Sequence, residues 1–308
     1  MPGTEAGAQG VANVREAFKY FRAGTLIKFL EDPELEFTDY IAPGPRGDVP
    51  LTAITKRREA GVTAPPNRPG YISLHGGGMV TGDRFLAVQT SWIKDFDMVM
   101  IAVDYRLAPE FTGLALVEDC YAALVWTGEN LAKLGIDPDR LIIGGESAGG
   151  GLAASTAMMA RDKGGPKICA QMLLCPMLDD RVHNYVSMKQ FWEDGLSRGK
   201  GCEFMWSLVL GDQMGKEDVS PYIVANRATD LSKLPIAYID VGTVEPFRDE
   251  VMAFASKIWE CGGQAELHIW PGGPHGFTTW VPTAEVSKAS MASIHNWLHR
   301  VLVKRDYA

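Results

Sequence analysis

One serine of the chain stands in a context that favours nucleophilic chemistry. Ser147 is preceded by Gly145 and followed by Gly149, in the sequence Gly-Glu-Ser-Ala-Gly. The apolar run 140–144 before it predicts a strand, and the segment 149–162 after it predicts a helix. Glycines in these positions permit a sharp strand-to-helix turn that lifts a serine hydroxyl to the carboxyl edge of a sheet. The segment therefore predicts a nucleophile for acyl transfer.

A second glycine-rich segment, His75-Gly76-Gly77-Gly78, ends another predicted strand, 71–75. Three successive glycines allow backbone N–H groups to point into one small volume. Acyl transfer needs such donors for the negative oxygen of the tetrahedral intermediate, and losing one donor typically slows the reaction about 10²–10³-fold. Together with the serine turn, this segment predicts an oxyanion hole, and the His75 ring is expected to brace the loop.

A serine nucleophile also needs a general base. His275 lies in the turn-rich sequence Trp-Pro-Gly-Gly-Pro-His-Gly-Phe after the last predicted strand, where catalytic groups gather in α/β sheets. His268 falls inside a strand pattern, and the pair His295 and His299 lacks the glutamate of a zinc-binding helix. His275 is therefore the predicted base.

The base in turn needs a carboxylate that orients it, and the chain order Ser, acid, His places that acid after the predicted strand 236–241. The candidates are Asp240, Glu245 and Asp249. Asp240 falls within the strand, and Asp249 falls in the helix expected from about residue 247. Glu245 lies in the intervening loop and is the predicted acid, with Asp249 as the alternative.

The elements that must position these residues alternate along the chain. Short apolar runs predict strands at 35–41, 50–55, 71–75, 99–103, 140–144, 171–175, 236–241 and 265–270. Helical patterns occupy 11–30, 116–134, 149–162, 247–261 and 283–303. Buried strands that alternate with amphipathic helices predict an α/β fold with a mainly parallel central sheet flanked by helices. The interval 180–233 shows no strand pattern and is expected to be helical.

The composition narrows the function classes. The 308 residues carry a net charge of -8, which argues against nucleic acid or an anionic membrane as partner. The five cysteines show no C-x-x-C spacing, so no disulfide framework and no metal site is expected. No leader pattern and no apolar run of about 20 residues is present, and a cytoplasmic enzyme is expected. No segment of the sequence matches a cofactor-binding motif in full, so no cofactor is expected.

Four segments together resemble the hormone-sensitive-lipase-like branch of α/β-hydrolases, and more narrowly its microbial and fungal carboxylesterases. They are His-Gly-Gly-Gly at 75–78, Gly-Glu-Ser-Ala-Gly-Gly at 145–150, Asp-Tyr-Arg-Leu-Ala-Pro at 104–109 and the loop around His275. The resemblance implies a single domain over 1–308, with a helical cap formed by about 1–34 and 181–233. It also implies oxyanion donors at Gly76, Gly77 and Ala148.

The chain departs from that family in two places. The family commonly has Asp-Pro-Leu-x-Asp-Glu at the acid, whereas this chain reads Glu-Pro-Phe-Arg-Asp-Glu at 245–250. An aromatic residue often follows His-Gly-Gly-Gly, whereas Met79 does here, which indicates an adaptable acyl pocket. Met79, Trp206 and Phe277 are the predicted substrate contacts.

The predicted function is a serine carboxylic-ester hydrolase that acts on short to medium acyl esters through an acyl-enzyme. A lactonase or a metabolite deacetylase would use the same residues and is the alternative. A small-molecule receptor on this fold would be expected to lack the serine or the histidine, and both are present. The expected partner is a small ester, and a homodimer is a further possibility.

Overall fold

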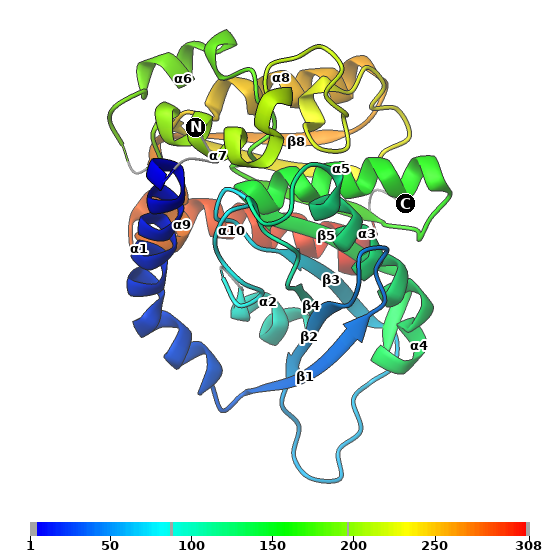
Figure 1. Cartoon of the computed structure of the whole chain (residues 1–308). Coiled ribbons are helices and arrows are strands. Elements are labelled where there is room, and N and C mark those ends of the chain that lie inside the picture. The colour runs from blue at the N-terminus through cyan, green and yellow to red at the C-terminus, as the bar shows by residue number, and fades with distance from the viewer. Residues whose placement is uncertain (1–4, 87–88, 196, 306–308) are drawn as a thin grey trace.

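The apolar runs of the sequence form one eight-stranded sheet at the centre of the molecule (Figure 1). The structure is a computed structural model that describes residues 5–86, 89–195 and 197–305. The strand order is β1-β2-β4-β3-β5-β6-β7-β8, antiparallel at β1–β2 and β2–β4 and parallel elsewhere. The strands are β1 (Leu35–Ala42), β2 (Val49–Lys56), β3 (Arg68–Leu74), β4 (Val99–Val103), β5 (Ile136–Glu146), β6 (Ala170–Leu174), β7 (Ile236–Val244) and β8 (Ala265–Pro274).

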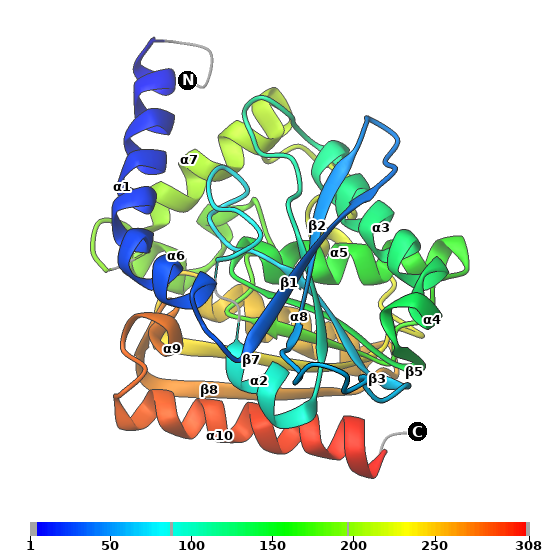
Figure 2. The same cartoon turned by 90° about the horizontal axis from the view of Figure 1, so that it is seen from below.

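Helices cover both faces of the sheet, because successive strand residues point to opposite sides. In β4, Val99, Ile101 and Val103 belong to one buried cluster with α3, α5 and α8, whereas Met100 and Ala102 belong to a second cluster with α2 and α10. Figure 2 shows α10 and α2 on the same side of the sheet. The flanking helices are α2 (Thr90–Phe96), α3 (Leu114–Glu129), α4 (Leu131–Leu134), α5 (Ala148–Lys163), α8 (Arg248–Glu260), α9 (Phe277–Trp280) and α10 (Glu285–His299), which continues as a π-helix over Arg300–Lys304.

The predicted fold class is confirmed, and all eight expected strands are present within a few residues of their expected bounds. The expected helix at 116–134 is divided into α3 and α4. The helices α2 and α9 were not predicted, because seven and four residues are too short to display a helical period. Within the part of the chain that the structure describes, 180–233 holds no strand, as expected.

Two segments distant in sequence lie together beyond the carboxyl ends of the strands. One is α1 (Glu5–Leu30), and the other carries α6 (Val186–Gln190), α7 (Gly199–Leu210) and the 3₁₀ turns Val182–Asn184, Gly211–Gln213 and Ala225–Arg227. Figures 1 and 2 both show α1 beside α7. They touch where a Cβ on Gly10 would lie 3.0 Å from the Phe204 ring. No helix among the described residues is sufficiently long and apolar to cross a membrane.

Candidate active site

Ser147 lies at the junction between β5 and α5, in a backbone conformation that few side chains adopt. Its φ is 60° and its ψ is -123°. The turn is tight enough that a Cβ on Gly145 would lie 2.3 Å from the carbonyl oxygen of Leu74, and a Cβ on Gly149 would lie 1.9 Å from it. Only glycine fits at either position. The spacing of the Gly-Glu-Ser-Ala-Gly sequence thus has a steric cause.

Ser147, His275 and Glu245 form a continuous hydrogen-bonded chain. The Ser147 Oγ lies 2.9 Å from Nε2 of His275, and Nδ1 of the same ring lies 2.5 Å from Oε2 of Glu245. The three residues follow β5, β8 and β7, so the parallel register of the sheet brings them to one edge. A serine that can pass its proton to an imidazole held by a carboxylate can act as an acyl-transfer nucleophile.

The carboxylate of Glu245 is fully buried and bound on both of its oxygens. Its Oε1 accepts the backbone N–H of Gly242 at 3.0 Å, while Oε2 faces His275. Desolvation of the ring lowers the pKa of His275, but the charge and hydrogen bond of Glu245 and the charge of Glu146 outweigh it and raise that pKa above its ordinary value. Glu245 therefore stabilises the imidazolium form.

The other candidate acids lie elsewhere. Asp249 lies in α8, where it accepts the backbone N–H of Ser187 at 2.7 Å and pairs with Arg248 at 2.8 Å. Asp240 accepts a hydrogen bond from the Ser290 hydroxyl at 3.0 Å, and desolvation by burial raises the pKa of the Asp240 carboxyl to about 7. Of the three candidates, Glu245 is the one hydrogen-bonded to His275.

The glycine loop after β3 lies directly against Ser147. A Cβ on Gly76 would lie 3.4 Å from the Cβ of Ser147, and Gly77 has a φ of 103° that favours glycine. The loop is braced by His75, whose ring stacks on Tyr105 at 4.1 Å. Ala148 is the first residue of α5, where backbone N–H groups have no partner within the helix. Gly76 and Ala148 thus lie next to Ser147, and Gly77 follows Gly76 in the same loop; the role of all three residues as donors stays a prediction.

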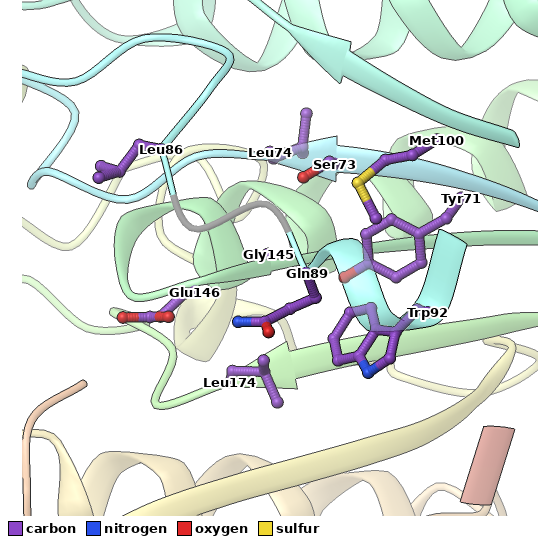
Figure 3. Close-up of a pocket in the computed structure, with 10 residues that line it drawn as sticks. All are labelled: Tyr71, Ser73, Leu74, Leu86, Gln89, Trp92, Met100, Gly145, Glu146 and Leu174. Carbon is purple, nitrogen blue, oxygen red and sulfur yellow. The ribbon is translucent and has the colours of Figure 1, made fainter. Parts of the chain in front are cut away.

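Glu146, the residue before Ser147, was not identified from the sequence. Its Oε2 accepts the hydroxyl of Thr279 at 2.9 Å, and burial raises the pKa of its carboxyl. It also lines a cavity of about 10 Å³ on the α2 side of the sheet (Figure 3), which has room for about one water molecule. The Trp92 Nε1 beside this cavity has no hydrogen-bond partner among the described residues. The cavity is too small for a substrate.

The three predicted substrate contacts are buried. Met79 is 1% exposed, Trp206 is 0% exposed and Phe277 is 4% exposed, so each packs inside the protein. A different residue of α7 reaches the glycine loop, because a Cβ on Gly78 would lie 2.8 Å from Cγ of Met205. Substrate contact by the three predicted residues stays a prediction, and Met205 is the neighbour of Trp206 that sequence reasoning missed.

The comparisons with known proteins agree with this geometry. A family model described as "alpha/beta hydrolase fold" matches residues 71–279. The chain belongs to this family. Carboxylesterase NlhH of Mycobacterium tuberculosis is 34% identical over 245 residues, which cover 76% of this chain and 75% of the relative. The resemblance that the four motifs indicated is thereby confirmed.

Solved structures of this α/β-hydrolase family match nearly the whole chain. The structure titled "Bacterial Heroin Esterase" has a TM-score of 0.87 at 33% identity and covers 95% of this chain and 92% of its own. The esterase LipW from Mycobacterium marinum has a TM-score of 0.81 at 30% identity, with coverage of 94% and 90%. Because 95% and 94% of this chain are covered, the similarity extends well beyond residues 71–279.

Proposed function

We propose that this α/β-hydrolase is a serine carboxylic-ester hydrolase that acts through a Ser147–His275–Glu245 triad. The observation that carries the proposal is the hydrogen-bonded chain from Ser147 Oγ to Glu245 Oε2. The matched relatives named above are a carboxylesterase and two esterases, which is the enzyme class that the sequence predicts. Enzymes of that class hydrolyse esters, and the proposed triad assigns each step of the hydrolysis to a residue of this chain.

Each residue then has a defined step. His275 Nε2 takes the Ser147 proton while Oγ attacks the ester carbonyl, and the backbone N–H groups of Gly76, Gly77 and Ala148 hold the developing oxyanion. His275 returns the proton to the leaving alcohol, which leaves an acyl-enzyme. Water, activated by the same imidazole, releases the acid. Glu245 keeps the ring in the tautomer that presents an unprotonated Nε2 to the serine.

The helices of the proposed cap limit the acyl chain. Arg15 of α1 donates from Nε to the carbonyl oxygen of Val80 at 2.9 Å and from Nη2 to that of Ala108 at 3.0 Å. Met205 of α7 contacts Gly78 from the same side. Arg15 thus ties α1 to the loop that follows the glycines and to the loop after β4, while Met205 places α7 against Gly78 itself. Helices held over the site in this way favour short and medium esters over long ones.

A panel of p-nitrophenyl esters from acetate to palmitate tests this function. We expect the highest kcat/KM between acetate and hexanoate, and a value at least about tenfold lower for palmitate, because methylenes beyond the pocket gain no binding energy. A covalent phosphonate inhibitor should abolish all of these rates. Activity that rises through palmitate would contradict the acyl-length proposal, and phosphonate-resistant hydrolysis would contradict the serine mechanism.

The rate should also depend on pH in a way that the charges around His275 determine. Only the neutral imidazole accepts the serine proton, so activity is lost as the pH falls through the pKa of His275, and that midpoint should lie above about 6.5. Glu146→Gln removes a charge that raises this pKa, so the midpoint should move to lower pH. Thr279→Val removes the hydrogen bond to Glu146 without removing the charge and serves as the control. An unchanged midpoint in Glu146→Gln would show that its charge does not reach the ring.

A further inference from the structure

A cysteine thiol that no catalytic step uses lies beside the acid and the base. Cys175 directly follows β6 with a φ of 35°, and its backbone N–H donates to the carbonyl oxygen of Asp240 at 2.8 Å. Its Sγ, a carboxylate oxygen of Glu245 and a ring nitrogen of His275 all lie within 4.8 Å of one another. Cys175 is 5% exposed and Glu245 is 0% exposed, so the cluster lies below the protein surface.

These three donors are the set that zinc and cadmium ions bind. Thiolate sulfur, imidazole nitrogen and carboxylate oxygen bind Zn²⁺ at about 2.3, 2.0 and 2.1 Å, and Cd²⁺ shares the preference for soft thiolates. In a tetrahedral site such ligand atoms lie roughly 3.3–3.6 Å apart. The three atoms of this cluster lie within 4.8 Å of one another, so side-chain shifts of about 1 Å would bring them to that spacing. The 2.5 Å contact between Glu245 and Nδ1 of His275 would open by about 0.8 Å to admit the ion.

We propose that Cys175, Glu245 and Nδ1 of His275 form a binding site for Zn²⁺ or Cd²⁺ that switches catalysis off. The proposal rests on the proposed triad, since the same imidazole would serve as base and as ligand. The spacing of the sequence did not predict a metal site, because the ligands follow three different strands, β6, β7 and β8, and meet only through the parallel register of the sheet.

The protons and charges of this step balance. The Cys175 thiol loses its proton to solvent and becomes a thiolate. His275 moves its proton from Nδ1 to Nε2, so that Nδ1 can donate its lone pair to the ion. The thiolate and the Glu245 carboxylate together neutralise the two positive charges of the ion, so the buried site carries no net charge. Water supplies the fourth ligand.

The consequence for catalysis follows from the new tautomer. With the proton on Nε2, the ring donates a hydrogen bond toward Ser147 and can no longer accept the serine proton at 2.9 Å. The oxyanion loop and the cap take no part in binding the ion. The ion should therefore lower kcat while leaving KM unchanged, and Mg²⁺ or Ca²⁺, which prefer oxygen ligands, should not act.

Inhibition by Zn²⁺ of hydrolysis of a short ester tests the site, with each variant normalised to its own metal-free rate. In Cys175→Ser the Zn²⁺ concentration for half inhibition should rise at least about tenfold, because the soft ligand is lost. Cys261→Ser, which removes a partly exposed thiol elsewhere, should behave as the unmodified protein does. Cys175→Ala serves if the serine variant folds poorly. Equal Zn²⁺ inhibition of the Cys175 variants and the unmodified protein would overturn the proposal.

Direct binding separates the metal site from the triad. In Ser147→Ala, which should have no turnover, Cd²⁺ should still bind with one equivalent and give the ultraviolet absorption of a cadmium–thiolate bond. Adding Cys175→Ser to that variant should abolish the signal. If Ser147→Ala stays active and still gives the Cys175-dependent signal, the proposed triad is contradicted and the proposed metal site is supported. If the signal does not depend on Cys175, the site fails whatever the outcome for the triad.

Discussion

Ser147→Ala is expected to lower kcat on a short ester by at least about 10⁴-fold, because it removes the atom that forms the acyl-enzyme. The residual rate would come from the oxyanion donors and substrate binding alone. Alanine keeps the Cβ of the native residue, so it adds no new strain to the turn at a φ of 60°. The folded structure should therefore be retained, with the melting temperature and circular dichroism of the unmodified protein.

His275→Ala is the companion to this variant, since the nucleophile and its base act as one unit. Ser147→Ala alone and His275→Ala alone should each lower kcat about as much as the double substitution does. Steady-state kinetics on one p-nitrophenyl ester with active-site titration of each variant measures this non-additivity. Retention of turnover within about tenfold in either variant, with the protein folded, would show that this chain cleaves esters by another route.

Glu245→Gln is expected to lower kcat at least about 10²-fold, the second large effect. Both groups that the carboxylate contacts are donors, namely the Gly242 N–H at 3.0 Å and Nδ1 of His275 at 2.5 Å. An amide accepts from one of them and turns its NH₂ group toward the other, in a site that is fully buried. In a serine protease the comparable Asp-to-Asn change lowers kcat about 10⁴-fold. The loss expected here is smaller, because the longer glutamate side chain can adjust its position relative to the imidazole.

Asp249→Asn is the matched control, because it makes the same chemical change at the alternative acid. Asp249 contacts Ser187 and Arg248 rather than the imidazole, so the loss in kcat should stay below about fivefold. The pH midpoint of activity should fall in Glu245→Gln and remain in place in Asp249→Asn, since Glu245 is the largest of the groups that raise the pKa of His275 and Asp249 is not among them. The reverse pattern, a severe loss in Asp249→Asn alone, would move the acid role to Asp249.

The strands and the serine turn could be predicted from the sequence, because each is determined mainly by residues that are close together in the chain. The inner strands β3, β4 and β6 are buried on both faces, and each therefore appears in the sequence as a short run of mostly apolar residues. Gly145 and Gly149 are required by contact with Leu74, so the serine turn has a fixed spacing. The sequence also placed Glu245 in the loop between a strand end and a helix start, and Glu245 is the candidate that lies in hydrogen-bond contact with His275; its role as the acid stays a prediction.

The parts that were missed depend on contacts between distant residues. Met205 lies against Gly78 of the glycine loop while its neighbour Trp206 is buried, and a helical pattern alone does not fix which of two adjacent residues points inward. Thr279 reaches Glu146, and Cys175 lies beside Glu245, through the register of separate strands. No spacing within the sequence signals such a meeting, because it is the folded sheet that creates it.

Covalent labelling tests the central claim most directly. The protein is incubated with a p-nitrophenyl alkylphosphonate, and the released p-nitrophenol and the intact mass are both followed. The triad predicts one equivalent of p-nitrophenol, one added phosphonyl group, and its location on the peptide that contains Ser147. Ser147→Ala should gain no mass under the same conditions. Labelling of any other residue with parallel loss of esterase activity, or full activity after complete labelling of Ser147, would contradict the assignment of Ser147 as the nucleophile.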